Sequence, residues 1–259
     1  MASKYNKRGQ ITIFIIIAVV VVAFIALAYT IYPKIRDSIG QESKNPQSFI
    51  SECVKDELEQ YVDLISKQGG SLEPEHFSMY MGDKIEYLCY TNEYYKTCTV
   101  QQPMLKQHIE RELQGSIAPQ VDACFNSLKS NYEGKGYSVQ IQPGEVKVEL
   151  LPKKIIGTFD YKVTITKDGT ETYNIFNIML NNNLYELISI SNSIIEWETT
   201  YGDVDPGMYM TYYKDLKVEK KKQQDSTKIY IVTDKNDNKI FQFASRSVAW
   251  PPGLGLSNE

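Results

Sequence analysis

The sequence predicts an α+β protein with one membrane-spanning helix at its N-terminus and an extracytoplasmic body. Three observations support this fold class. An uncharged apolar run extends from Ile11 to Tyr32, and all four cysteines follow it. Near Tyr137, the spacing of apolar residues changes from the helical value of about 3.6 to the strand value of about 2. We therefore expect a disulfide-tied helical part, followed by an antiparallel sheet with one or two helices.

The apolar run is long enough to cross a bilayer. Its 22 residues contain no charge, proline or glycine, and as a helix they cover about 30 Å, the thickness of a bilayer core. Lys4, Lys7 and Arg8 precede the run, and no acidic residue does. The positive-inside rule then places Met1 in the cytoplasm and the body outside the cell membrane.

Two cleavage sites compete with a permanent anchor. Ala26-Leu27-Ala28 has the small-x-small form that signal peptidase prefers. The apolar run continues beyond it to Tyr32, however, and this length favours an anchor over a signal core. The other candidate site lies between Gly9 and Gln10.

That second site is suggested by a resemblance. The letters KRGQITIF at residues 7–14 resemble the class III leader of archaeal type IV pilin-like proteins, including membrane-anchored surface proteins of small-genome archaea. The resemblance extends over residues 7–32. It implies that a prepilin-peptidase-like enzyme cuts between Gly9 and Gln10, and that Gln10 becomes the first residue of the mature helix.

The chain also departs from the family pattern. Thr12 stands where the family has serine, and Phe14 stands where it has the glutamate that registers neighbouring subunits in a filament. Pro33, Gly40 and Pro46 then interrupt the helix that pilins usually continue. We therefore expect simple anchoring in the bilayer, with filament assembly as the alternative.

The charge of the body excludes one class of partner. The formal charge of the chain is -4, and the three basic residues before the apolar run leave -7 beyond it (-4 - 3). A body this acidic has no electrostatic footprint for nucleic acid. The one basic cluster, Lys217 to Gln224, is interpreted as a solvated edge strand protected by lysines.

The chain divides into six predicted segments. These are a basic cytoplasmic leader, the transmembrane helix, a linker, a disulfide-tied helical subdomain, a β-rich α+β subdomain and a flexible tail, at 1–9, 10–33, 34–46, 47–134, 135–249 and 250–259. In the helical subdomain, one amphipathic helix runs from Pro46 to the Gly69-Gly70 pair, and another runs from near Pro103 to Tyr132. A hairpin is expected between them.

The cysteines predict two disulfides. Cys53, Cys89, Cys98 and Cys124 form no C-x-x-C pair, and an even count in an exported body favours disulfides over metal binding. Of the three ways to pair them, we favour Cys53 with Cys124, which ties the two helices, and Cys89 with Cys98, which closes the hairpin.

Alternating residues predict the strands of the second subdomain. Residues 137–152 suggest two strands joined by a Pro143-Gly144 turn, and residues 159–179 suggest two more around Asp168-Gly169. A helix is expected over 184–195 and a shorter one after Asp205, followed by three strands.

Few residues carry a recognisable chemistry. His76 and His108 belong to no metal-ligand spacing, and the sequence has no phosphate-binding loop or nucleophile motif, so we assign no cofactor and no catalytic residue. Asp203 and Asp205, two apart before a turn, are a candidate calcium pair whose other interpretation is a helix cap.

The tyrosines leave two interpretations open. The chain has 19, with clusters at residues 87–95 and 209–213, and such rings suit either a recognition face or packing within a sheet. We expect a non-enzymatic, membrane-anchored protein with a structural, adhesive or interaction role and a protein or cell-surface partner. The alternatives are a pilin-like filament subunit and an extracytoplasmic hydrolase that uses carboxylates.

Overall fold

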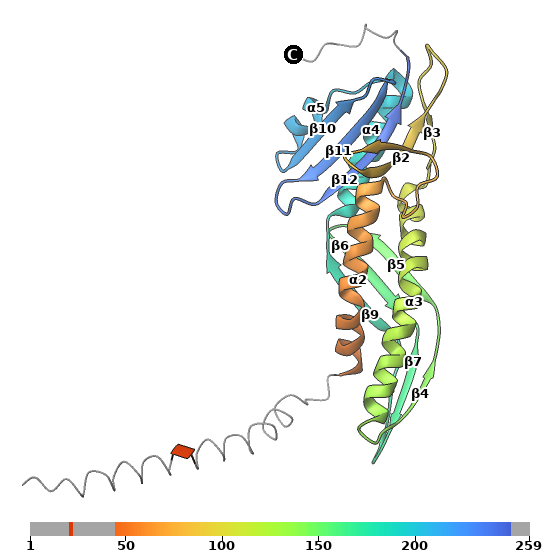
Figure 1. The fold of residues 1–259 in the computed structure, drawn as a ribbon, viewed down its shortest axis with the longest axis vertical. Coiled ribbons are helices and arrows are strands. Elements are labelled where there is room, and N and C mark those ends of the chain that lie inside the picture. Colours follow the sequence, from red (N-terminus) through yellow and green to blue (C-terminus); the bar gives the residue numbers. More distant parts are fainter. Residues whose placement is uncertain (1–20, 23–44, 250–259) are drawn as a thin grey trace, which may run out of the picture. The chain divides into compact units, whose positions relative to one another are not determined.

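The computed structural model describes residues 21–22 and 45–249, and Figure 1 shows its ribbon. Contacts divide the chain into Met1–Asn45 and Pro46–Glu259, and the second unit is the body. The predicted membrane helix (except residues 21–22), the Gly9/Gln10 cleavage site and the predicted tail lie outside the described residues. Among the residues that are described, no helix has the length and apolar character needed to cross a membrane.

The body is an α+β fold, as predicted, and two long helices pack side by side in it. Helix α2 spans Pro46–Gln68 and helix α3 spans Leu105–Glu133. Each buries residues three or four apart along one stripe, which is the pattern of an amphipathic helix. α2 ends where Gly69 and Gly70 adopt positive φ angles of 85° and 110°, a conformation that glycine accepts without steric cost.

Both disulfides join the cysteine pairs that the sequence analysis favoured. Cys53 on α2 is bonded to Cys124 on α3 with a Cα–Cα distance of 5.9 Å, and Cys89 is bonded to Cys98 with 5.3 Å. The two bonds close loops of 71 and 9 residues. In the chain-entropy picture, the longer loop stabilises the fold by about 4 kcal/mol and the shorter one by about 3 kcal/mol.

Six short strands form a long three-stranded ribbon under the helix pair (Figure 1). Their bounds are β4 Ser138–Gln142, β5 Val146–Leu151, β6 Lys154–Phe159, β7 Lys162–Thr166, β8 Thr170–Tyr173 and β9 Phe176–Asn181. β4 pairs with β7 and β7 with β8, while β5 pairs with β6 and β6 with β9, all antiparallel. Only two or three residues separate β4 from β5, β6 from β7 and β8 from β9. The two sheets are therefore consecutive parts of one meander.

This arrangement corrects the predicted turn at Pro143-Gly144. β4 and β5 do not pair with each other, and the chain reverses instead between Leu151 and Lys154, which are register partners. At Gly144 the strand passes so close to its neighbour that an added Cβ would lie 1.7 Å from the carbonyl oxygen of Asp160. Gly144 allows two strands to approach closely while the chain continues in the same direction. In the sequence, a glycine needed for this reason looks the same as one needed for a turn.

The predicted hairpin around Asp168-Gly169 is present, with Thr166 opposite Thr170. The helix pair covers one face of the meander, because α3 contacts β4 and β5 while α2 contacts β9. The side chains that face the helices alternate along each strand, as a half-buried sheet requires. They include Val148, Leu150, Phe159 and Ile178.

A larger sheet combines strands from both halves of the sequence. Its strands are β1 Phe77–Tyr80, β2 Asp83–Tyr90, β3 Thr99–Val100, β10 Leu216–Lys222, β11 Thr227–Asp234 and β12 Ile240–Arg246. The order is β1-β2-β12-β11-β10, with β3 beside β2, and the β2–β12 pairing is parallel. Strand β10, which carries the lysine cluster, ends the order as an edge strand.

Two helices accompany this sheet. Helix α4 (Leu184–Tyr201) contacts β11 and β12, and α5 (Pro206–Tyr212) contacts β10. α5 begins as expected, since the side chain of Asp205 accepts a hydrogen bond from the backbone N–H of Gly207 at 2.9 Å.

One hydrophobic core runs through the whole body. A single cluster of buried residues extends from Ile50 on α2 through Phe125 and Ile178 to Phe243 on β12. The predicted boundary between residues 134 and 135 is therefore crossed by the core and by the β2–β12 pairing. A second, smaller cluster, centred on Ile85 and Ile229, packs on its own.

Candidate functional site

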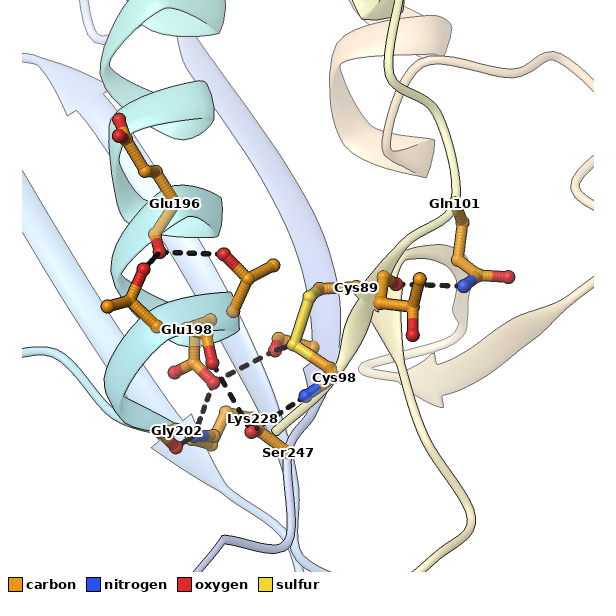
Figure 2. The surroundings of a disulfide bond; sticks show 12 residues. Cys89, Cys98, Gln101, Glu196, Glu198, Gly202, Lys228 and Ser247 are labelled. Atoms are coloured by element: carbon orange, nitrogen blue, oxygen red, sulfur yellow. Dashed lines mark hydrogen bonds and ion pairs between the residues drawn. A yellow bond between two sulfur atoms is a disulfide. The ribbon is translucent and has the colours of Figure 1, made fainter. Parts of the chain in front are cut away.

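A buried charged network lies beside the Cys89–Cys98 disulfide, between α4 and the larger sheet (Figure 2). Its central residues are Glu198 on α4 and Lys228 on β11, whose Oε2 and Nζ atoms are 2.6 Å apart. The Glu198 side chain is 0% exposed and that of Lys228 is 6% exposed. Charges as deeply buried as these are tolerated only when they are paired and hydrogen-bonded.

Every polar atom at the centre of this network has a partner. Lys228 Nζ also donates to the carbonyl oxygen of Gly202 at 2.7 Å. Glu198 accepts a hydrogen bond from the Tyr230 hydroxyl and another, of 3.1 Å, from Ser245 Oγ. Burial raises the pKa of Glu198, and the hydrogen bonds and charge of Lys228 offset only part of that effect.

A second acid–base pair extends the network toward the surface. Asp203 Oδ1 accepts from Lys220 Nζ at 2.9 Å and lies 3.5 Å from Lys228 Nζ. Partial burial by itself raises the pKa of Asp203, but the charges of Lys228 and Lys220 outweigh burial and hold that pKa below its ordinary value. The contacts of this network join α4 and the residues that follow it to strands β10 and β11.

The disulfide is connected to this network through two serines. Ser245 Oγ lies 3.6 Å from Cys98 Sγ and donates to Glu198, while Ser247 Oγ accepts from the backbone N–H of Cys98 at 3.1 Å. The network therefore also holds one end of the segment that follows β2.

That segment, residues 91–97 between the two bonded cysteines, is the disulfide loop. It is braced against the residues that follow β12: Tyr95 N–H donates to Val248 O at 2.8 Å, and Val248 N–H donates to Lys96 O at 3.1 Å. Arg246 Nη1 donates to Thr91 O at 2.6 Å. The loop presents two exposed rings, Tyr94 at 63% and Tyr95 at 70% exposure.

The structure separates the residues of each tyrosine cluster. Tyr87 and Tyr209 are buried, whereas Tyr94, Tyr95 and the pair Tyr212-Tyr213 are exposed. Each cluster therefore contains rings that pack inside the body and rings that are exposed for contact. Tyr87 packs in the small core cluster with Ile85 and Ile229, whereas Tyr94 and Tyr95 are exposed on the segment between the bonded cysteines.

The two histidines have different surroundings. His76 is exposed and its ring packs against Tyr87 and Tyr90, with centroids 4.7 and 4.2 Å away. His108 Nε2 lies 2.8 Å from Ser71 Oγ, which donates to Glu86 Oε2 at 2.5 Å. Burial lowers the pKa of His108 and raises that of Glu86.

This serine–histidine–glutamate chain is not arranged as a nucleophile with its base. The carboxylate of Glu86 contacts Ser71 instead of orienting the histidine, and Ser71 is buried. Its three residues come from the loop after α2, from β2 and from α3, so the chain ties these elements together. Sequence reasoning missed it because the residues are 15 and 37 positions apart.

The two candidate calcium ligands are each held by protein groups. Asp203 binds lysines of the network, and Asp205 caps α5. Within residues 45–249, no group of three or more histidine, cysteine, aspartate or glutamate side chains is placed to hold a metal ion.

Comparison of the chain with protein-family models, with curated proteins and with solved structures found no match.

Proposed function

We propose that this chain is a single-pass membrane protein whose disulfide-tied body lies outside the cell membrane and makes structural or adhesive contacts with a protein partner. The two disulfides support an oxidising compartment for the body. The apolar run from Ile11 to Tyr32 supports the anchor, and the three preceding cations support the orientation.

The distribution of exposed apolar side chains is the observation that carries the contact role. The chain enters the body at Pro46, where α2 lies against β9. At 1.5 Å per residue, the 23 residues of α2 lead about 34 Å away to the larger sheet. Leu64 on α2 and Met104 before α3 are exposed apolar residues of the helix pair. Most of the large exposed apolar residues of the body lie in the half that holds the larger sheet, namely Met79, Met81, Tyr94, Tyr95, Val100, Trp197, Tyr201, Met210, Tyr212 and Tyr213. The meander contributes Ile175 and Met179.

Such a concentration favours a contact surface over a catalytic one. Aromatic and methionine side chains are enriched at protein interfaces. Tryptophan and tyrosine are also enriched among the few residues that carry most of the binding energy. The acidic residues of the buried network, by contrast, are bound to lysines, which gives the hydrolase alternative no specific support.

Protease treatment of intact cells tests the topology. Added protease is expected to remove the body from the cell surface and to leave an N-terminal fragment in the membrane. A body that is cut only after the cells are lysed would contradict the proposal.

The N-terminal residue of the purified native protein tests the anchor. A start at Met1 or Ala2 corresponds to an uncleaved anchor, and Gln10 corresponds to the pilin-like processing suggested by the resemblance at residues 7–14. A start at Tyr29 would mean that the apolar run is a removed signal.

A further inference from the structure

We infer that the disulfide loop, residues 91–97, is a preorganised protein-recognition loop whose contact residues are Tyr94 and Tyr95. This inference rests on the proposed function and goes further by naming the binding element and the class of its partner. Four observations in the described body support it: closure, bracing, an unusual backbone conformation and local charge.

The loop is held at both ends and along one side. The Cys89–Cys98 bond closes it, and its backbone is hydrogen-bonded to residues 246–248 at Thr91, Tyr95 and Lys96. Thr91 Oγ1 also accepts from the backbone N–H of Glu93 at 3.1 Å. A loop fixed before binding loses little conformational entropy when it binds, and this raises affinity without any added contact.

Tyr95 occupies a conformation that its side chain does not favour. Its φ angle is 62°. This value lies in the left-handed region, which glycine or asparagine adopts with less steric strain than a bulky residue does. The ring is 70% exposed, so burial gives little in return for that strain. Strained residues of this kind persist where the surrounding structure fixes them, and they gather at binding sites.

The charge of the loop identifies the partner class. Glu93 and Lys96 form an ion pair with each other at 2.5 Å, so the loop carries no net charge, and the body is acidic. Anionic lipid and nucleic acid are therefore poor partners. Two exposed tyrosines beside Thr91 and Asn92 match the composition of loops that bind protein surfaces, where tyrosine supplies contact area and the small polar residues supply hydrogen bonds.

The test compares two variants, each of which places a glycine at a left-handed position. Tyr94→Ala/Tyr95→Gly removes both rings and relieves the left-handed strain. Ile175→Gly is the matched control, because Ile175 is also exposed and also left-handed, with φ 59°, but lies in the meander. Both variants are expected to unfold within a few degrees of the wild type, since glycine suits both backbones.

Full-length protein in lipid nanodiscs is titrated with envelope vesicles from cells that lack its gene. We expect saturable binding that weakens at least tenfold in the tyrosine variant, is unchanged in Ile175→Gly and disappears after the vesicles are treated with protease. A Cys89→Ser/Cys98→Ser variant that remains folded is expected to bind more weakly than the wild type, because the loop is no longer closed.

Several results would overturn the inference. These are the absence of wild-type binding to these vesicles, equal binding by the tyrosine variant, and binding that survives protease but is lost after periodate oxidation of surface sugars. Binding that appears only with vesicles from cells that carry the gene would also overturn it, because the partner would then be a second copy of this chain. Proteolysis of intact cells reports the topology separately. A body exposed on cells together with an unaffected tyrosine variant would reject the loop and leave the proposed membrane topology standing.

Discussion

At the scale of single residues, the body depends on charges that are buried only because they are paired. Glu198 lies on α4 and Lys228 lies on β11. Their opposite charges are paired where the helix packs against the sheet. Breaking such a pair leaves an uncompensated charge, which costs far more than the pair itself contributes. This asymmetry makes the network testable.

Lys228→Met is expected to lower the free energy of unfolding by about 3–5 kcal/mol, because it leaves the buried Glu198 carboxylate unpaired. The double variant Glu198→Gln/Lys228→Met is expected to be more stable than Lys228→Met, since its buried amide carries no charge. Denaturant unfolding measures both. Lys217→Met, which alters a half-exposed lysine of β10, is the control and is expected to change stability by less than about 0.5 kcal/mol. Equal stability of the single and double variants would rule out the unpaired charge as the cause.

The Asp203 carboxylate predicts how stability depends on pH. Its pKa in the folded state lies below the ordinary value, so the folded protein binds this proton less tightly than the unfolded chain. The contribution of Asp203 to the free energy of unfolding is therefore complete above the pKa of the unfolded chain, about 3.9. It is lost as the pH falls through the pKa of the folded state. Asp203→Asn is expected to be less stable than the wild type at pH 7, and the difference is expected to shrink below about pH 4. Unfolding curves from pH 2 to 7 measure it, and a difference that stays constant to pH 2 would assign the effect to something other than titration.

At the scale of elements, the meander depends on the irregularity that separates β4 from β5. Three residues, Pro143 to Glu145, separate β4 from β5. Opposite them, only Asp160 and Tyr161 separate β6 from β7, so the first of these strands carries one extra residue. A hydrogen bond of 2.9 Å from Asp160 N–H to Glu145 O keeps the two strands together across it. Such a bulge bends the ribbon, so the strands stay against the helix pair along their length.

Gly144→Ala tests the close approach at this bulge. The added methyl group would lie against the Asp160 carbonyl, and the backbone would have to move, so we expect a loss of about 1–3 kcal/mol in the free energy of unfolding. Gly169→Ala in the β7–β8 turn is the matched control, because its added Cβ meets no atom within 4 Å. A loss of similar size in both variants would indicate a general effect of removing glycine.

At the scale of the whole molecule, the body is held as one unit by a pairing that joins distant parts of the chain. β2 pairs in parallel with β12, and the core passes from the helix pair into the larger sheet. The two predicted subdomains therefore share both a sheet and a core.

We expect the body of the oxidised protein to unfold in one cooperative transition, because neither half can lose its structure without exposing the shared core. Differential scanning calorimetry measures this, with fluorescence and circular dichroism as independent probes. Two separate transitions, assigned to residues 47–134 and 135–249, would show instead that the halves fold independently.

The sequence by itself determined most of the local structure. The apolar spacing of α2, α3 and α4, the Asp205 cap and the Asp168-Gly169 turn depend on neighbouring residues, so they were predictable from local patterns. The cysteine pairing was also predicted, because only one scheme ties two helices and closes a hairpin. The hairpin of β1 and β2 was missed, although Gly82 in its two-residue turn was a usable signal.

Only the tertiary structure decided which distant residues meet. The β2–β12 pairing, the bulge at Gly144, and the partners Glu198 and Lys228 connect residues far apart in the chain, and no local pattern encodes such a contact. The same holds for the candidate binding loop. Tyr87 and Tyr95 are alike in sequence, but Tyr87 lies in a strand that packs inward and Tyr95 on a loop fixed by Val248. Burial is a property of the packed molecule, and the exposure of a ring is therefore settled only when the whole chain has folded.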